Sequence, residues 1–509
     1  MSTSILRTSL RSAQSSIPRP CRHTPLQSMI RYNSSSASTS KTASPTPSQQ
    51  LYTLNEIDKL TTSIAQSSSG PIHHPSPLVM RALPAPWLSS QSPDLASQGD
   101  TCSVDPHTSS AEPFTEEELL RPRHMSESFT SFDLPLASDA KLYERYVNTS
   151  GGFRMGKLLE HLDSLAGAVA YRHCLPTPKA SQSTEAQAFH ESSSRAGLYL
   201  ATASADRLDM FGRLNRENVR DLKFSGFVTW TGRSSLEVVV KMEGHKPSEQ
   251  SGHDKTLMLG RFAMVCRDSK THKARQVPRL LVESEEEKVL WAIGEEHQKR
   301  RKTSAMAALD KVPPSSAEAE ELHKLMLQVS TKEEVDGEQV VPMQDTEIQT
   351  VQLMFPQDRN LHGKVFGGIL MRVVSHRPRF ELCFTNAALF SQAPMRFLAL
   401  DQITFRLPVP IGAVLRLSSK VVKTTKPHEG PDGEAKVHIM VRAEVEEVDT
   451  GVRRETNTFF FTMAKEDDKP IGRTVIPSTY AEAMHYLEGK RRLEVGDEMR
   501  RLYQVGQSQ

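Results

Sequence analysis

Apolar residues recur at helical spacing in one segment of this chain, between Gly156 and Tyr171. They form a single continuous stripe: Leu158, Leu159, Leu162, Leu165, Ala166, Val169 and Ala170. Strand-like segments come later, at Leu236–Met242, where apolar residues occupy every second position, and at Leu257–Cys266. The pattern predicts a helix whose apolar face is buried against a sheet.

The same order of elements recurs roughly two hundred residues later. Gly367 and Gly368 open an apolar segment, Ile369–Met371. Strand patterns then follow at Ile403–Leu407, Leu415–Leu417, Val437–Val445 and Thr456–Met463. A helix followed by antiparallel strands, found twice, predicts an internal duplication of one α+β domain.

We assign the two domains to residues 142–283 and 346–468. Residues 284–345 are dense in Glu, Lys, Ala and Leu, which predicts a charged helical connector interrupted at Pro313 and Pro314. Residues 469–509 predict a C-terminal helical extension.

The N-terminal region has a different composition. Its first acidic residue is Glu56, and the stretch before it is basic and rich in Ser. Such a start is typical of a mitochondrial transit peptide, which we assign to residues 1–33, with the matrix as the expected location. An ordinary Ser-rich tail is the alternative. Residues 34–128 hold too little apolar surface to offset their ordering entropy, so we expect a disordered linker with one short helix near Glu116–Arg121.

Composition excludes several classes of protein. The chain has 509 residues with 63 Lys and Arg against 61 Asp and Glu, a balance that does not favour nucleic-acid binding. The hydrophobic fraction of 37% is low because the N-terminal region dilutes it. The 5 cysteines lie far apart without a CxxC pair, so we expect no disulfide scaffold and no metal site. No apolar run approaches the ~20 residues of a transmembrane helix, and we expect a soluble protein.

One segment carries a specific motif: Asp358-Arg-Asn360-Leu-His362-Gly363-Lys-Val-Phe366-Gly367-Gly368-Ile-Leu-Met371. It resembles the D-x-N-x-x-G-x-x-F-G-G signature of acyl-CoA thioesterases with the hotdog fold, in which an antiparallel sheet wraps a central helix. Segments Arg154–Gly167 and Phe224–Val238 resemble the tandem-hotdog mitochondrial branch of that family. The resemblance implies two hotdog domains packed as a pseudo-dimer, with sites between one domain's helix start and the other's sheet. It also implies hydrolysis of acyl-CoA to a carboxylic acid and CoA, without a cofactor, in a homo-oligomer such as a trimer.

The chemistry of the motif agrees with that activity. Glycines at 363, 367 and 368 let the backbone approach a ligand closely. The free N–H groups of a helix start can stabilise the oxyanion that forms at a thioester carbonyl. A carboxylate on the helix can act as general base for water. Because no G-x-S-x-G motif is present, we expect direct attack by water rather than an acyl-enzyme.

The resemblance and these arguments select three candidate catalytic residues. Asp163, beside the buried stripe of the first helix, is the candidate base, and a solvated helix acid is the alternative. Asn360 can orient water or the carbonyl, although Asn is also a common turn residue. Glu381 is the acid near the second helix, one place beyond the usual position.

Six further residues are candidates for substrate binding: Gly156, His362, Gly367, Gly368, Arg233 and Ser234. The last two follow a turn at Gly232 and suit CoA phosphates, since Arg binds phosphate with two parallel hydrogen bonds. The alternative, to which we give equal weight, is that Arg233 and Ser234 form a surface cluster on an exposed strand edge.

The second helix departs from the family pattern at residues 374–379, where Pro378 interrupts it. A proline inside a helix costs about 3 kcal/mol. We interpret this segment as a local insertion, and if it is genuine the second site is weakened. Two rival functions therefore stay open, a non-catalytic acyl-CoA-binding protein and a hotdog acyl-CoA hydratase or dehydratase. The second rival needs a paired Asp and His on the hotdog helix and the loop that follows it, and we find no such arrangement in the sequence.

Overall fold

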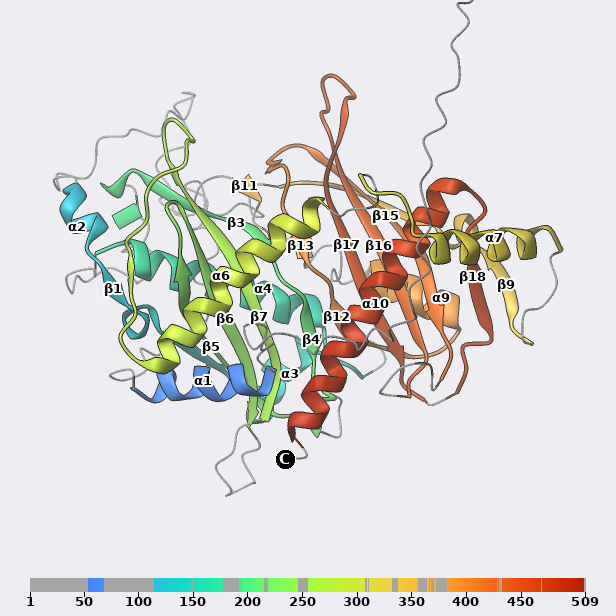
Figure 1. Cartoon of the computed structure of the whole chain (residues 1–509), viewed down its shortest axis with the longest axis horizontal. Coiled ribbons are helices and arrows are strands. Elements are labelled where there is room, and N and C mark those ends of the chain that lie inside the picture. Colours follow the sequence, from blue (N-terminus) through green and yellow to red (C-terminus); the bar gives the residue numbers. More distant parts are fainter. Residues whose placement is uncertain are drawn as a thin grey trace, which may run out of the picture. The chain divides into compact units, whose positions relative to one another are not determined.

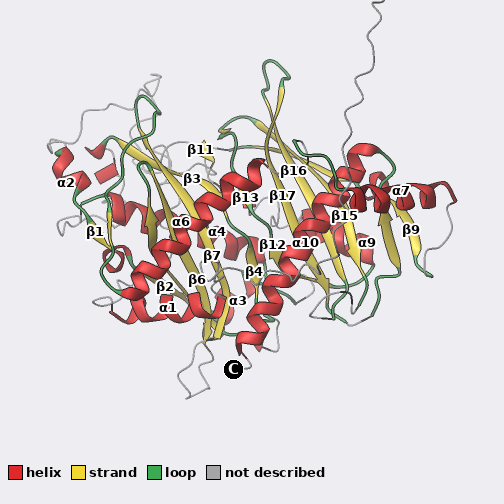
Figure 2. Ribbon diagram, viewed as in Figure 1, coloured by secondary structure: helices red, strands yellow, loops and turns green. Residues whose placement is uncertain are grey.

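The computed structural model describes residues 54–67, 114–148, 151–176, 192–193, 195–214, 218–245, 255–306, 309, 311–331, 337–355, 364–365, 367, 370–371, 382–427, 429, 433–467 and 469–507. All of these residues belong to one compact unit, Tyr52–Gln509. Its strands form one large sheet and a few short pairs, with helices packed on both faces of the large sheet (Figure 2).

The apolar stripe of the first half forms helix α4 (Met155–Cys174), as predicted, and every residue of the stripe is buried. Antiparallel strands pack around this helix: β2 (Thr130–Leu134), β3 (Leu198–Ala205), β4 (Leu208–Met210), β5 (Asp221–Thr231), β6 (Ser235–His245) and β7 (Lys255–Asp268). They pair in the order β2-β5-β6-β7, and both β3 and β4 pair with β7.

The second half repeats this layout around helix α9 (Leu382–Ser391). Its strands are β10 (Ile348–Leu353), β12 (Met395–Leu400), β13 (Ile403–Thr404), β15 (Val414–Thr425), β16 (Lys436–Glu446) and β17 (Arg453–Lys465). They pair in the order β10-β15-β16-β17-β12, which matches the first half strand for strand. A helix wrapped by an antiparallel sheet is the hotdog fold, and the chain contains it twice.

The two halves join edge to edge in a single 12-stranded sheet. At the junction, Leu400 pairs with Leu208, and Ile403 pairs with Ala205. Adding one constant to a residue number of the first half gives the corresponding position in the second half, so that Ala205 corresponds to Leu400 and Leu208 to Ile403. When each residue is replaced by its counterpart, one seam pair becomes the other. The junction, which we call the seam, therefore has an internal twofold relation, and the duplication predicted from the sequence forms a pseudo-dimer.

A turn before each half's first sheet strand repeats in detail. In the first half the turn is η4 (Met125–Ser128), and in the second it is η6 (Met343–Thr346). Ser128 Oγ accepts a hydrogen bond from the N–H of Val228 at 2.9 Å, and Thr346 Oγ1 accepts one from Val421 at 3.0 Å. Matching hydroxyl contacts at matching strand positions support one ancestral fold for both halves.

A long helix crosses the outer face of each half-sheet, opposite α4 or α9 (Figure 1). These helices are α6 (Glu285–Met306) and α10 (Tyr480–Gln507). Each has a glycine where it meets the sheet: a Cβ on Gly294 would strike Trp230, and one on Gly489 would lie 2.9 Å from Val422. The glycines let each helix lie close to the strands beneath it.

The remaining elements are short or peripheral. They are α1 (Leu54–Ser67), α2 (Glu116–Leu120), α3 (Ala140–Glu144), α7 (Ser316–Thr331), β1 (Arg123–His124), β8 (Leu280–Leu281), β9 (Gln339–Pro342), β11 (Lys364–Val365), β14 (Val409–Pro410) and β18 (Arg473–Ile476). Within the described residues, no helix is both long and apolar enough to cross a membrane.

The short helix expected near Glu116–Arg121 is present as α2. The expectation of a disordered linker over the rest of residues 34–128 differs from the structure, which places α1, β1 and η4 inside that range. Helix α1 packs on the first half: Ile64 is buried, and Asp58 forms an ion pair with Lys241 at 2.8 Å. The Ser-rich composition of the region concealed the short apolar stripe of α1. The strand expected at Ile403–Leu407 is also shorter, since β13 ends at Thr404. The helices expected in the connector are present as α6 and α7.

Two buried histidines make the stability of this fold depend on pH. Burial lowers the pKa of His173 to about 4, and burial with the nearby Arg207 guanidinium holds the pKa of His438 well below its usual value. Both rings are therefore neutral when folded, whereas the unfolded chain takes up protons below about pH 6.5. The free energy of unfolding therefore has its full value above about pH 6.5 and decreases as the pH falls below that value.

We expect the free energy of unfolding to fall by up to about 1.4 kcal/mol per pH unit and per histidine below that pH. Urea unfolding at pH 7.5 and pH 5 measures the loss. His173→Gln should reduce the difference between the two pH values. An unchanged difference would contradict this assignment.

Candidate active site

The candidate base Asp163 lies on α4, buried at 3% exposure. Its Oδ1 accepts a hydrogen bond of 2.9 Å from the hydroxyl of Thr202 on β3. A buried carboxylate fixed by a hydroxyl is restricted to one orientation, which a general base needs. Asp163 is thus a held acid at the face of α4 that meets the sheet, not a solvated helix acid.

One glycine of the second half's motif, Gly367, is linked to this acid by contacts across the seam. The N–H of Phe405 donates to the carbonyl of Ala203, the residue after Thr202, at 2.9 Å. A Cβ on Gly367 would lie 2.8 Å from the ring of Phe405. Phe405 therefore links the glycine of the second half to the acid and hydroxyl of the first. The close contact also explains why a glycine occupies position 367.

Gly156 is not part of this arrangement. It is buried in the first turn of α4, about 10 Å along the helix from Asp163 at 1.5 Å per residue. The start of α4 has no capping side chain at Arg154 and no acid in its first turn. Its first N–H groups and its positive dipole end therefore receive no side-chain cap from Arg154.

Several candidates lie outside the described residues: Asn360, His362, Gly368, Glu381 and the 374–379 segment. Arg233 and Ser234 are described, and they lie in the turn between β5 and β6. Arg233 is exposed, its carbonyl accepts from the N–H of Val277 at 3.0 Å, and that of Ser234 accepts from Cys266 at 2.9 Å. These contacts tie the turn to the C-terminal end of β7 and the segment after it.

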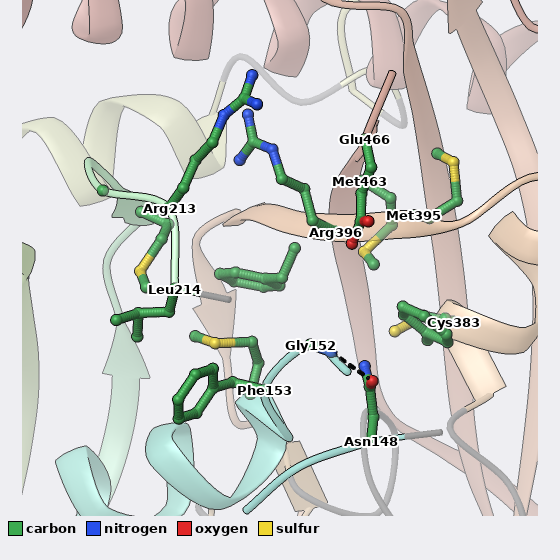
Figure 3. Close-up of a pocket in the computed structure, with 15 residues that line it drawn as sticks. Asn148, Gly152, Phe153, Arg213, Leu214, Cys383, Met395, Arg396, Met463 and Glu466 are labelled. Atoms are coloured by element: carbon green, nitrogen blue, oxygen red, sulfur yellow. Dashed lines mark hydrogen bonds between the residues drawn. The ribbon is translucent and has the colours of Figure 1, made fainter. Parts of the chain in front are cut away.

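A pocket of about 140 Å³ lies between the halves at the start of α4 (Figure 3). We call it the seam pocket. Its apolar walls come from both halves: Phe153, Met155, Met210, Leu214, Cys383, Phe384, Met395, Phe397 and Met463. The side chain of Asn148 closes one corner by accepting a hydrogen bond of 2.8 Å from the N–H of Gly152.

Two arginines lie at the rim of the seam pocket. The guanidinium groups of Arg213 and Arg396 lie near one another, away from Cys383 (Figure 3). Both pair with the buried carboxylate of Glu434, Arg213 at 2.6 Å and Arg396 in a second, short contact. Glu466, the acid among the described lining residues, is exposed to solvent.

Curated relatives cover most of the chain. Mitochondrial acyl-coenzyme A thioesterase 9 of Mus musculus is 31% identical over 381 residues, which are 74% of this chain and 79% of the relative. The Homo sapiens protein of that name is 32% identical over 380 residues, covering 73% and 78%. Mitochondrial acyl-coenzyme A thioesterase 4 of Humulus lupulus is 31% identical over 387 residues, covering 74% and 68%. The chain belongs to the acyl-CoA thioesterase family.

Solved structures with detectable similarity have low TM-scores. An acyl-CoA hydrolase from Staphylococcus aureus with butyryl coenzyme A matches 33% of this thioesterase and 96% of its own chain, at 20% identity and a TM-score of 0.28. An acyl-CoA hydrolase from Agrobacterium tumefaciens matches 69% and 98%, at 18% identity and a TM-score of 0.21. No family model matches the thioesterase.

One cluster in this thioesterase has ligand types that suit a metal: Asp206, Glu237 and His297. Arg301 already lies among them, 3.3 Å from Asp206 and 3.0 Å from Glu237. Although burial opposes its charge, the hydrogen bond with His297 and the nearby cations hold the pKa of Glu237 below its usual value. The guanidinium therefore supplies the positive charge that a metal would bring, and the cluster anchors α6 to the sheet.

Sequence reasoning missed Thr202 and the rim of the seam pocket. Thr202 lies in a loosely patterned strand, far in sequence from Asp163. Arg396 and Glu434 both belong to the second half, and Arg213 of the first half reaches Glu434 only because the halves join at the seam.

Proposed function

We propose that this thioesterase hydrolyses acyl-CoA thioesters to a free carboxylic acid and CoA by direct attack of water, with Asp163 as general base. The supporting observation is the buried Asp163 carboxylate, which accepts a hydrogen bond from Thr202. The next residue along the strand, Ala203, is bonded to Phe405, whose ring lies against Gly367. A base must be oriented before it can take a proton from water in one direction.

The steps follow from this placement. Asp163 accepts a proton from water while the oxygen of that water bonds to the thioester carbonyl carbon. The carbonyl oxygen becomes an oxyanion. Backbone N–H groups of the Gly367-Gly368 segment are the proposed donors to that oxyanion, and Asn360 is the proposed group that orients the carbonyl. The C–S bond then breaks, and the thiolate of CoA takes up the proton from Asp163.

No cofactor takes part in this scheme, because the carboxylate and the backbone donors supply its proton transfer and charge stabilisation. The proposed location is the mitochondrial matrix, supported by the acid-free, basic N-terminal segment and by the mitochondrial names of relatives. A trimer of these double-hotdog chains stays a prediction, which the mass of the native particle would test.

Release of thiol from a panel of acyl-CoAs tests the activity. We expect steady release that is proportional to enzyme concentration for at least one chain length. Binding of acyl-CoA without release from any member would favour the non-catalytic rival. Loss of the enoyl-CoA absorbance without thiol release would favour a hydratase.

Thr202→Val should lower kcat about tenfold with little change in KM, because the hydroxyl orients Asp163 without contacting substrate. Thr202→Ser keeps the hydroxyl and should keep most of the rate. Steady-state kinetics of both variants measure the difference. If the serine variant is as slow as the valine variant, a hydroxyl at position 202 does not by itself maintain the rate, and the proposed orienting role of that hydroxyl is contradicted.

A further inference from the structure

One short segment of the second half lies between the strand that carries Thr202 and the glycine motif. It runs over residues 403–410, and we call it the bridge segment. Its start, β13, pairs with β3 of the first half. Its end, β14, pairs with β11, which lies just before Gly367 in the sequence. The bridge segment is therefore attached at one end to the strand beside Asp163 and at the other to the motif.

A β-bulge in β3 gives the bridge segment its contact with the first half. The register of β3 with β7 shifts directly after Thr202, and Ala203 is the extra residue of the bulge. Residues three apart normally face opposite sides of a strand, but the bulge turns both Thr202 and Ala205 toward the core. The carbonyl of Ala203 accepts the hydrogen bond of 2.9 Å from the N–H of Phe405. Strand β12 has a bulge at the corresponding place in the second half, so both halves share this feature.

The peptide group between Thr404 and Phe405 is held through both of its polar atoms. Its N–H donates to Ala203 of the first half, and its carbonyl accepts a hydrogen bond of 3.0 Å from Nδ2 of Asn457. Asn457 is a fully buried residue of β17 in the second half. Two hydrogen bonds on opposite sides fix the plane of a peptide group. The backbone from which the Phe405 side chain projects is therefore positioned by both halves.

The ring of Phe405 ends on the backbone of Gly367. A Cβ at position 367 would lie 2.8 Å from Cζ of the ring and 3.2 Å from both Cε1 and Cε2. The φ angle of Gly367 lies outside the left-handed region, so the ring contact, and not the backbone conformation, excludes a side chain there. The ring thus packs directly on the backbone that we propose as an oxyanion donor.

We infer that Phe405 is a positioning residue for the proposed hydrolysis: its ring holds the backbone of Gly367 in place, while its N–H binds the strand whose Thr202 orients Asp163. The inference rests on the proposed function. Oxyanion donors lower the barrier only if they are already in position when the charge develops. Loosening such a donor weakens binding of the transition state and not of the substrate, so the effect belongs in kcat.

Phe405→Leu tests this role with a small change, because it removes the three ring atoms nearest Gly367 and keeps the backbone N–H. We expect kcat to fall about tenfold, less than for loss of a whole donor, with little change in KM. Leu407→Ala is the matched control, since Leu407 lies in the same bridge segment but is 43% exposed, and it should keep the wild-type kcat. Steady-state thiol release measures both constants. A wild-type kcat in a folded Phe405→Leu enzyme overturns the inference.

Gly367→Ala tests the same contact from the other side. Its methyl group meets the ring of Phe405, so this variant alone should also lose about tenfold in kcat. In the Phe405→Leu background the methyl group enters the space that the ring has left, and the double variant should be faster than either single variant. Losses that simply multiply in the double variant would show that Phe405 does not act through Gly367. Melting curves of the three variants separate a loss of rate from a loss of fold.

Hydrogen exchange of the full-length protein measures the same positioning without a substrate. The peptide that contains Gly367 should exchange at least about threefold faster in Phe405→Leu than in wild type, and at the wild-type rate in Leu407→Ala. Equal exchange in all three proteins overturns the inference. If the wild type releases no thiol from any acyl-CoA, the proposed function fails, and the exchange rates still decide whether Phe405 holds Gly367. An active wild type with an equally active Phe405→Leu variant removes the positioning role and leaves the proposed hydrolysis intact.

Discussion

Replacing Asp163 with asparagine is expected to lower kcat for acyl-CoA hydrolysis by about a thousandfold, within the range for loss of a general base. Asparagine preserves the shape and the hydrogen bond with Thr202 but cannot take a proton from water. Because Asp163 is not expected to hold the CoA moiety, KM should change little. Thiol release under saturating substrate measures kcat, and a melting curve confirms that the fold is intact.

Glu160→Gln is the matched control for this experiment. Glu160 is an acid on the same helix, one turn before Asp163, and it is equally buried at 3% exposure. Its loss should leave kcat within about threefold of wild type. A full rate in Asp163→Asn would falsify the base assignment. Equal losses in both variants would mean that the helix, rather than one carboxylate, had been disturbed.

The sequence predicts the parts of this thioesterase that depend on local periodicity. The stripe from Leu158 to Ala170 specifies α4, and the alternation in Val437–Val445 specifies β16, because each pattern fits only one side-chain period. The duplication also follows from the sequence, since both halves repeat the same order of elements. Asp163 is a candidate from the sequence because the family resemblance implies an acid on the first central helix and because this residue borders the apolar stripe.

What the sequence could not predict depends on register between distant strands. The Thr202 contact with Asp163 requires β3 to cross α4 at one position, and no local pattern fixes that crossing. The rim of the seam pocket requires the halves to meet through β4 and β12. Helix α1 escaped notice for a different reason, because its short apolar stripe lies in Ser-rich sequence and is stabilised by tertiary contacts with the first half.

The two outer helices show how the duplicated halves have diverged at the seam. The shift that takes Asp206 to Asp401 and Gly294 to Gly489 takes Arg301 of α6 to Gly496 of α10. A Cβ on Gly496 would overlap the guanidinium of Arg207. In the second half, an arginine at the α10 position that corresponds to Arg301 is therefore replaced by Arg207 of the first half. Arg207 thus joins the two halves.

Arg207→Met is expected to lower the free energy of unfolding by about 3–5 kcal/mol, because it removes the guanidinium that pairs with the buried Asp401 carboxylate. Asp209 loses Arg207 as well but keeps its ion pair with Arg500. Gly496→Arg alone should also destabilise the protein, since its side chain collides with Arg207. Combined, the two changes place an arginine where α6 carries Arg301, and the double variant should be more stable than Arg207→Met alone. Urea unfolding measures the free energy of unfolding of the two single variants and the double variant. Arg501→Met is the control, since it removes an exposed arginine of α10 that pairs with Glu498. It should lower the free energy of unfolding by less than about 1 kcal/mol. Strictly additive losses in the double variant would show that position 496 is not the counterpart of Arg301. A double variant that is more stable than the sum of the two single losses predicts would show that one buried arginine is needed at each half's outer helix. It would also show that either half can supply this arginine.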